Sequence, residues 1–207
     1  MAVVSRQQQA NIVAVLGASG SGKTSYVMQR LRKEKPKRLI IWDTKGEFSR
    51  EGYATPVYTL AEAVKALQNK TFKVAYIPRG DAATMKKEFS LLCRAAFHAK
   101  ALTLVAEELS DITEPSRACE GWRKCTSQGR SEGITVYGLS QQPASIDKHF
   151  FGNCSLVRTG RLNFGAHIKS MAECLGVDRE EVRKLLPLEF IERDMLTGEV
   201  LRGKLTF

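Results

Sequence analysis

The segment NIVAVLGASGSGKTSYVMQRL, residues 11–31, decides the fold. A short apolar run leads into the glycine-rich stretch GASGSGKT, residues 17–24, and a pattern typical of a helix follows. Glycines at such positions let the backbone turn so that its N–H groups surround phosphate oxygens, with the positive end of the next helix behind them. In the pattern GxxxxGK[ST] the lysine reaches the β- and γ-phosphates, and the final hydroxyl is placed to ligate Mg²⁺. The segment therefore predicts a Walker A phosphate-binding loop between a strand and a helix.

We expect this loop to bind ATP together with Mg²⁺. A chance match to the pattern is the alternative, and the strand before it and the helix after it argue against that. GTP is not expected, because the sequence has no base-reading NKxD motif: Asn69-Lys70 is followed by Thr71-Phe72. The residues expected to bind the nucleotide are Gly17, Ala18, Ser19, Gly20, Ser21, Gly22, Lys23, Thr24 and Ser25, with Lys23 also acting in catalysis and Thr24 as a metal ligand.

Composition is that of a single globular domain. The chain has 207 residues, of which 43% are hydrophobic and 26% charged, and this predicts one unit with a sizeable core. We assign residues 1–207 to one P-loop ATPase domain, with a core at about 11–160 and C-terminal helices and a hairpin at 161–207. Residues 1–10 are expected to form a polar lead-in.

Charge and hydropathy restrict the partners and the location. The 32 Lys and Arg residues exceed the 22 Asp and Glu residues, and the resulting charge of +10 favours a polyanionic partner. The longest apolar runs, at 12–16 and 101–106, are far shorter than a membrane span, and the N-terminus lacks the hydrophobic region of a signal peptide. We therefore expect a cytoplasmic location. The five cysteines have no CxxC spacing, so reduced thiols are expected rather than a metal site or disulfides.

A second chemical site is expected where ALTLVAEE, residues 101–108, ends in two carboxylates. An apolar strand that ends in paired acids is the Walker B arrangement, in which the first acid holds Mg²⁺ through its water shell and the second activates the attacking water. Glu107 is the expected metal ligand and Glu108 the expected catalytic base. The alternative is a strand end with two solvent-facing acids.

Two further strands end in polar residues. RLIIWDTKGEF, residues 38–48, contains an apolar run typical of a parallel strand buried on both faces, and it delivers Asp43, Lys45 and Glu47 at its carboxyl end, where ligand groups gather in open α/β sheets. We count Asp43 and Glu47 among the nucleotide-binding residues. The strand expected at 134–139 leads directly into Ser140-Gln141-Gln142-Pro143.

These motifs resemble the FtsK–HerA superfamily of P-loop motor ATPases. The DxKGE element at 43–47 is similar to the Asp-Pro-Lys-Gly-Glu of that family, with Thr44 in place of Pro. The family also has Arg-x-x-Gly-Ile, an apolar strand and then Thr/Ser-Gln-x-Pro, and at this spacing the chain has Arg130, Gly133, Ile134, Ser140, Gln141 and Pro143. The resemblance implies a three-layer α/β domain of the RecA/ASCE type, with a mainly parallel sheet.

The resemblance also implies roles for two catalytic residues. Gln141 would read the γ-phosphate from a strand between the Walker A and Walker B strands. Arg130 would be the finger that reaches the nucleotide of a neighbouring subunit. A helix-end cation is the alternative for Arg130, and Arg117 or Arg123 could supply the finger instead.

Within this superfamily, the size of the chain is most similar to the genome-packaging ATPases of membrane-containing icosahedral viruses. That implies a homo-oligomeric ring of six or five subunits, double-stranded DNA as partner, capsid vertex or membrane portal proteins as docking partners, and a location in host cytoplasm or at the virion's packaging vertex. Alternatives are a cellular or plasmid DNA-processing or conjugation ATPase, a small-molecule P-loop kinase and a non-catalytic phage assembly protein. The kinase would have no use for the Gln141 sensor.

The remaining pattern predicts the other elements and two candidate DNA contacts. The basic run RLRKEKPKR, 30–38, is either a solvated helix end or a nucleic-acid contact, and the same two interpretations apply to Arg193, Arg202 and Lys204. We expect a strand at 72–78, an edge strand at 153–159, a hairpin turned at Thr197-Gly198, and helices at 60–69, 82–99, 114–125, 166–175 and 178–186.

Overall fold

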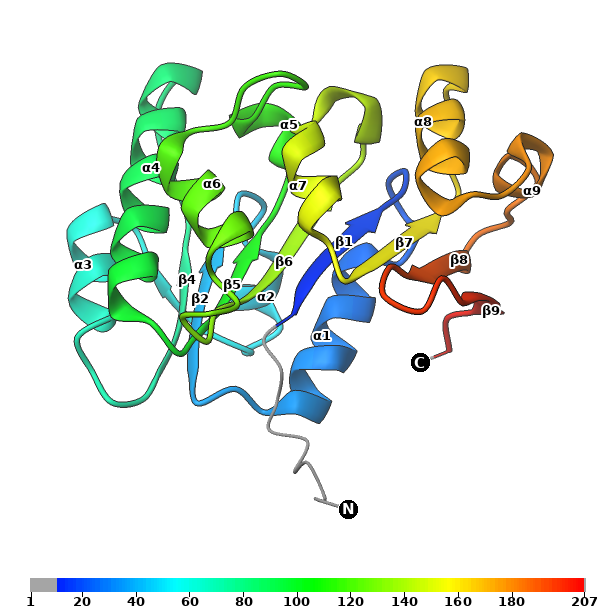
Figure 1. The fold of residues 1–207 in the computed structure, drawn as a ribbon. Helices are drawn as coiled ribbons and strands as arrows, with labels where there is room; N and C mark the ends of the chain where they lie inside the picture. Colours follow the sequence, from blue (N-terminus) through cyan, green and yellow to red (C-terminus); the bar gives the residue numbers. More distant parts are fainter. Residues whose placement is uncertain (1–10, 207) are drawn as a thin grey trace, which may run out of the picture.

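A nine-stranded sheet forms the centre of the molecule (Figure 1). The computed structural model describes residues 11–206; the polar lead-in predicted for residues 1–10, and Phe207, lie outside them. The strand order is β3-β4-β2-β5-β6-β1-β7-β8-β9, with parallel pairing from β3 to β7 and antiparallel pairing of β7 with β8 and of β8 with β9. The strands are β1 (Ile12–Leu16), β2 (Arg38–Trp42), β3 (Thr55–Val57), β4 (Phe72–Tyr76), β5 (Thr103–Ala106), β6 (Thr135–Ser140), β7 (Leu156–Gly160), β8 (Glu189–Asp194) and β9 (Val200–Lys204).

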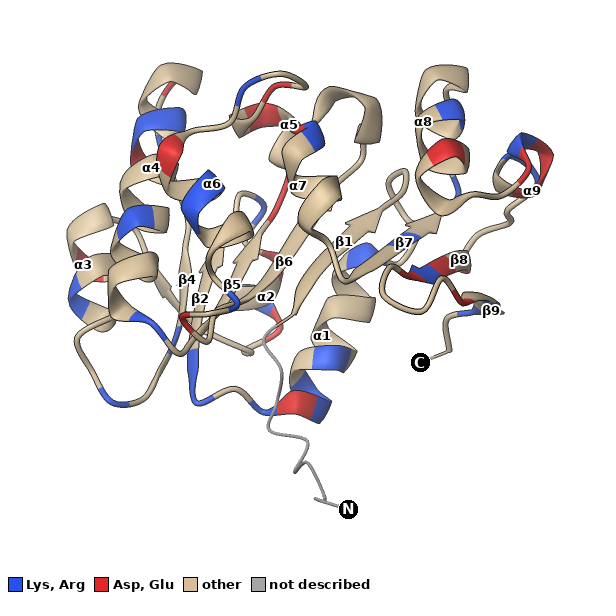
Figure 2. Ribbon diagram, viewed as in Figure 1, with Lys and Arg blue, Asp and Glu red and all other residues tan. Residues whose placement is uncertain are grey.

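Helices cover both faces of the sheet, which confirms the predicted three-layer α/β fold with a C-terminal hairpin. On β1, Val13 and Val15 pack with α1, whereas Ile12 and Ala14 belong to the larger core under α3 to α9. Lys and Arg positions are distributed over most helices and connecting segments (Figure 2). The helices are α1 (Lys23–Glu34), α2 (Glu47–Arg50), α3 (Leu60–Ala66), α4 (Ala82–Ala99), α5 (Leu109–Ile112), α6 (Glu120–Ser127), α7 (Lys148–Asn153), α8 (Gly165–Leu175) and α9 (Arg179–Arg183), with a 3₁₀ turn at Pro143–Ser145.

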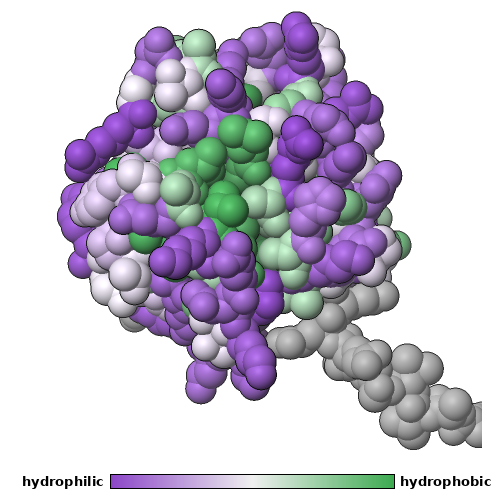
Figure 3. All heavy atoms as spheres, turned by 90° about the vertical axis from the view of Figure 1, so that its left-hand side faces the viewer, coloured by the Kyte–Doolittle hydropathy of each residue, from purple (hydrophilic) through white to green (hydrophobic). Residues whose placement is uncertain are grey.

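Strand β3 forms one edge of the sheet and was not predicted, because it is three residues long and contains Pro56. Figure 3 views the molecule from this side and shows an apolar patch in the middle of the face. Val57, the last residue of β3, and Leu60, the first residue of α3, are half-buried, and Tyr58 between them is exposed.

Two expectations for the second half of the chain are wrong. The helix predicted from residue 114 begins only at Glu120, because Glu114 and Arg117 pair across a tight turn and the short helix α5 precedes it. The strand predicted at the edge, β7, lies inside the sheet, because the hairpin of β8 and β9 pairs with it and extends the sheet. The local pattern contained no information on which strand the hairpin would join.

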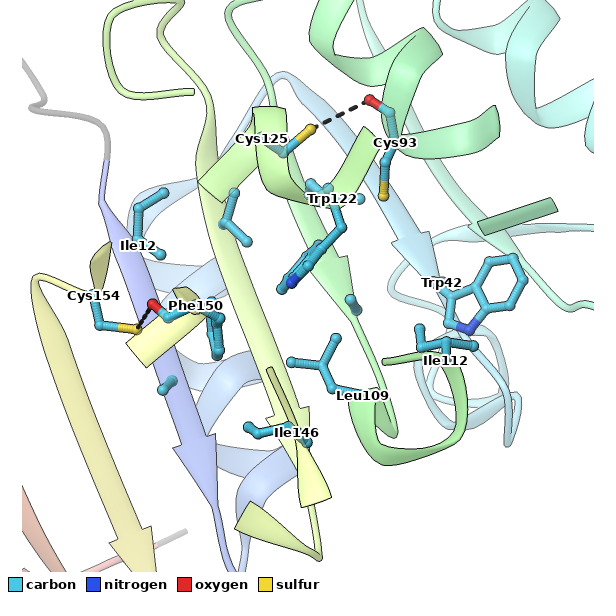
Figure 4. Close-up of a cluster of buried hydrophobic side chains, with 14 of the residues drawn as sticks. Ile12, Trp42, Cys93, Leu109, Ile112, Trp122, Cys125, Ile146, Phe150 and Cys154 are labelled. Carbon is cyan, nitrogen blue, oxygen red and sulfur yellow. Dashed lines mark hydrogen bonds between the residues drawn. The ribbon is translucent and has the colours of Figure 1, made fainter. Parts of the chain in front are cut away.

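The larger core lies between the sheet and α4, α6 and α7 (Figure 4). The Trp122 ring is fully buried between Phe89 and Phe150, with ring centroids 5.5 and 5.2 Å away. The thiol of Cys125 donates to the carbonyl oxygen of Cys93 at 3.3 Å, so this sulfur is packed as part of the core. Within residues 11–206, no helix is long and apolar enough to cross a bilayer.

Replacing Gly121 by Ala is expected to lower the free energy of unfolding by about 1–3 kcal/mol. Helices α4 and α6 approach so closely that a Cβ atom at Gly121 would lie 2.4 Å from the carbonyl oxygen of Ser90, a backbone atom that cannot move aside. Gly152→Ala in α7 is the matched control, because no described atom outside the local helix backbone lies within 4 Å of its added Cβ. Denaturant unfolding should show Gly152→Ala unchanged or more stable by up to about 1 kcal/mol; equal effects of the two substitutions would contradict the packing described.

Candidate nucleotide-binding site

The Walker A loop connects the end of β1 to the start of α1. Its glycines adopt conformations that L side chains rarely adopt, with φ of 147° at Gly17, 72° at Gly20 and 85° at Gly22. A Cβ atom at Gly17 would lie 2.4 Å from Ser21 Oγ, whereas no described atom lies within 4 Å of one built at Gly20. The loop is therefore closed on the side of Gly17, and its backbone is open to a ligand at Gly20.

The Lys23 side chain folds back over this loop. Its Nζ atom donates to the carbonyl oxygens of Gly17, at 2.8 Å, and Ala18, at 3.1 Å. Burial lowers the pKa of the Lys23 ammonium, and the Glu108 carboxylate opposes this shift. Among the described residues, the buried Ser21 Oγ has no hydrogen-bond partner. A cation at a glycine-rich turn fits the oxygens of a phosphate group.

Glu107 follows β5 and is 3% exposed. Burial, and after it the nearby Asp43 carboxylate, raises the pKa of Glu107 to about 8. The Glu107 Oε2 atom has no hydrogen-bond partner among residues 11–206. Glu107 and Thr24 line the same cavity. A buried carboxylate beside a hydroxyl fits Mg²⁺, whose charge would favour the ionised form of Glu107.

Glu108 is held by residues that follow two other strands. Its Oε1 atom accepts hydrogen bonds from Lys45 Nζ, at 2.5 Å, and from Gln141 Nε2, at 2.7 Å. Although burial opposes it, these two bonds and the charges of Lys45 and Lys23 hold the pKa of Glu108 below its usual value. The Glu108 backbone has a φ of 46°, a conformation that is costly for a side chain other than glycine and that is concentrated at functional sites. Glu108 is therefore an ionised carboxylate in a fixed position.

These residues share one cavity of about 250 Å³ at the carboxyl ends of the central strands. Gln141 follows β6, which lies between the Walker A strand β1 and the Walker B strand β5, as the resemblance implied. The cavity is lined by Ser19, Gly20, Gly22, Lys23, Thr24, Ser25, Lys45, Glu47, Glu107, Glu108, Leu139, Gln141 and Leu188.

Comparison with known proteins gives one curated relative and several similar folds, and no family model matches the chain. Protein P9 of Pseudoalteromonas phage PM2 is 27% identical over 175 residues, which are 83% of this chain and 78% of that protein. The genome packaging NTPase B204 from Sulfolobus turreted icosahedral virus 2, in complex with AMPPCP, has a TM-score of 0.75 at 15% identity and covers 95% of this chain and 98% of its own. VirB4 of Thermoanaerobacter pseudethanolicus has a TM-score of 0.67 at 8% identity, over 94% of this chain and 89% of its own.

The chain has the P-loop NTPase fold of B204 and VirB4. The sequence resemblance is thus confirmed at the level of the fold. Structures of B204 have also been solved with AMP and with ATP-gammaS, so in that protein the fold binds adenine nucleotides.

Four of the residues expected to bind the nucleotide do not line the cavity: Gly17, Ala18, Ser21 and Asp43. Ala18 and Ser21 are buried in the loop, and Asp43 is fully buried behind Glu107, where its Oδ2 atom accepts from the backbone N–H and the hydroxyl of Ser49. Conversely, Lys45 contacts Glu108, a role that the sequence analysis did not assign. The signal was present, because Lys45 lies in the DxKGE element between Asp43 and Glu47.

Arg130 lies at the other end of the sheet. It precedes the amino end of β6, whereas Gln141 follows the carboxyl end of the same strand. The Arg130 Nη2 atom donates to the carbonyl oxygen of Asn153, the last residue of α7, at 2.6 Å. This is the contact that the helix-end interpretation predicts. Because Arg130 is exposed and remote from the cavity of its own chain, a role as a finger could be exerted only on another subunit. Arg117 and Arg123 are also exposed.

Replacing Lys23 by Met is expected to weaken ATP binding by about 10- to 100-fold, because a charge-assisted hydrogen bond to phosphate contributes about 1.5–3 kcal/mol. The fold should be retained, since Met keeps the apolar stem and no buried ion pair is broken. Titration with a fluorescent ATP analogue measures the affinity. Lys87→Met, at an exposed position on α4, is the matched control and should bind as the wild type does. Equal affinities of wild type and Lys23→Met would contradict the assignment.

Proposed function

We propose that this chain is an ATPase that hydrolyses Mg·ATP and uses the cycle to move double-stranded DNA, packaging a viral genome into a preformed capsid. One observation carries the proposal: three residues that follow adjacent strands line a single cavity. Lys23 follows β1 and its loop, Glu108 follows β5, and Gln141 follows β6. A phosphate-binding loop, an ionised carboxylate and an amide donor are the groups that phosphoryl transfer to water requires.

Each residue has a defined part in hydrolysis. When bound, Mg·ATP supplies the transferable γ-phosphoryl group and the charge of the metal. Lys23 and the loop N–H groups would bind phosphate oxygens, while Thr24 and Glu107 would hold the metal. Glu108 would orient a water molecule and accept its proton as the water oxygen bonds to the γ-phosphorus, while the bond to the β–γ bridging oxygen breaks and ADP leaves. Gln141, which already contacts Glu108, would link this base to the γ-phosphate.

Assembly follows from the position proposed for the finger. If Arg130 acts on a neighbouring subunit, every site needs two chains, and a closed ring of six or five subunits supplies them. The net charge of +10 supports binding to the DNA phosphate backbone. Such a motor would work in the host cytoplasm or at the virion's packaging vertex, docked to a capsid vertex or membrane portal protein.

A cellular or plasmid DNA-processing or conjugation ATPase is the second candidate, and the fold likeness to VirB4 favours it. The two candidates share their catalytic residues, so genome context distinguishes them: neighbouring capsid genes would favour packaging. The likeness to a phage PM2 protein supports the viral interpretation.

ATP hydrolysis by the purified chain, measured with and without duplex DNA over a range of protein concentrations, tests the proposal. We expect the rate per chain to rise with protein concentration and with DNA. A rate per chain that depends on neither would contradict an assembling DNA motor. Phosphate transfer to a small molecule without DNA would instead support a kinase, and full biological function of an inactive variant would support an assembly protein.

A further inference from the structure

A basic groove lies at the end of the sheet opposite the nucleotide site. It has a volume of about 410 Å³, and it precedes the amino ends of β2 and β4, whereas the Walker A loop follows the carboxyl end of β1. Its two walls are joined by a hydrogen bond of 2.9 Å from the Phe72 N–H to the Lys37 carbonyl oxygen. The groove is lined by Lys35, Pro36, Lys37, Thr71, Phe72 and Lys73.

Arg38, the first residue of β2, follows the groove residue Lys37 and is held by several contacts. The Arg38 guanidinium donates to the carbonyl oxygens of Leu67, at 3.2 Å, and Ala99, at 3.0 Å, and it lies 5.3 Å from the centre of the Phe72 ring. Arg38, the last residue of the basic run at 30–38, therefore has a structural role. These contacts tie the start of β2 to the ends of α3 and α4 and to the Phe72 ring at the start of β4, so the neighbouring lysines stand on an ordered surface.

The positive charge of the groove is not neutralised by neighbouring acids. Its three lysines are exposed, and three more exposed cations, Arg32, Lys33 and Lys70, lie within three residues of them in the sequence, on α1 and before β4. None of these six takes part in an ion pair within residues 11–206, although other Lys and Arg residues form nine. Glu34, the acid of the basic run, binds Arg30 and the Tyr137 hydroxyl instead. Figure 2 shows basic residues at the end of α1 and on the segment that follows it.

Two of the three basic residues of the C-terminal hairpin differ in this respect, whereas Lys204 is exposed and forms no ion pair within residues 11–206. The Arg193 guanidinium donates to the carbonyl oxygen of Leu175 at 2.9 Å, and Arg202 pairs with Glu181. These two side chains are committed to contacts within the chain, so the hairpin is the weaker of the two candidate DNA contacts.

We propose that the basic groove binds the phosphate backbone of duplex DNA. This inference rests on the proposed function and names the surface that the DNA contacts. Lysine ammonium groups are compact, strongly hydrated point charges, which suit exchangeable contacts without sequence preference better than the bidentate contacts of arginine do. A motor that moves along DNA needs contacts of this kind.

Helix α1 connects the groove to the nucleotide site. It begins at Lys23 in the Walker A loop and ends at Glu34 beside Lys35, and its 12 residues span about 18 Å. A shift of the loop on phosphate binding or release would therefore be carried along one rigid helix to one wall of the groove.

The test is the salt dependence of binding to a random-sequence duplex, measured by fluorescence anisotropy on the full chain. In the triple variant Lys35→Ala, Lys37→Ala, Lys73→Ala we expect weaker binding, and a slope of log affinity against log salt that is smaller by about 2.7, because three phosphate contacts are lost. The triple replacement by Arg at the same positions should keep the slope of the wild type. The matched control is Lys87→Ala, Lys148→Ala, Lys184→Ala, which removes the same charge from exposed positions outside the groove and should leave the slope unchanged.

The outcomes separate this inference from the proposed function. Hydrolysis without DNA should be unchanged in the groove variant, because none of its residues lines the nucleotide cavity. If the wild type binds DNA and hydrolyses ATP, but the groove variant binds with an unchanged slope or the control loses as much, the groove is not the DNA surface and the proposed function stands. If the wild type binds no duplex at low salt, both are overturned.

Discussion

Replacing Glu108 by Gln is expected to lower kcat for ATP hydrolysis by about 10²–10⁴-fold, the usual contribution of a positioned general base. Gln has nearly the same shape, and its amide oxygen can still accept from Lys45 and Gln141, but it cannot take a proton from water. Binding of Mg·ATP should therefore be retained while the chemical step fails. Single-turnover hydrolysis, together with a titration of nucleotide binding, measures the two effects separately.

Glu114→Gln is the control for this substitution. Glu114 is an exposed carboxylate that pairs with Lys86 on the surface, so its replacement removes a charge without touching the cavity and should leave kcat unchanged. Wild-type turnover in Glu108→Gln would show that another group activates the water. The same variant also distinguishes a motor from a non-catalytic assembly protein, whose function it should not affect.

Replacing Arg130 by Ala is expected to lower turnover by about 10³–10⁵-fold, if Arg130 supplies transition-state charge to the neighbouring subunit. The measurement is the ATPase rate at protein concentrations at which the wild type is assembled. Nucleotide affinity should change little, since the cavity of each chain stays intact. Arg117→Ala and Arg123→Ala, at the two other exposed candidates, are the comparisons that identify which arginine acts.

A mixing experiment separates the finger from the helix-end cation. Arg130→Ala subunits keep a complete cavity, and Glu108→Gln subunits keep a complete finger, so mixed assemblies should recover activity that neither variant has alone. If Arg130 only caps α7, its replacement costs less than about 1 kcal/mol of stability and leaves turnover unchanged. That result would contradict its catalytic role.

The sequence predicted the centre of the molecule well, because the decisive features there are local. The Walker A pattern requires glycines with unusual φ angles, and the apolar runs of β1, β2, β5 and β6 are continuous and long enough to be buried on both faces. Since parallel strands bring their carboxyl ends to one edge of a sheet, the order of the motifs along the chain was enough to predict that Glu107, Glu108 and Gln141 lie near the loop.

The errors arose where pairing and packing decide the structure. Strand β7 has the same composition whether or not the hairpin pairs with it, and nothing local specifies that the sheet continues through β8. The start of α6 was predicted too early because the turn at Glu114 and Arg117 depends on a cross-turn pairing. The contact of Lys45 with Glu108 joins residues 63 apart in the chain, and the pattern of charges alone did not assign a partner to Lys45.

An experimental structure of Glu108→Gln with Mg²⁺ and ATP tests most directly whether these residues form one hydrolytic site. We predict that Lys23 and the loop N–H groups contact the phosphates, that Thr24 and Glu107 hold the metal, and that residues 108 and 141 face the γ-phosphate. A nucleotide bound elsewhere, or Gln141 directed away from the γ-phosphate, would contradict the account.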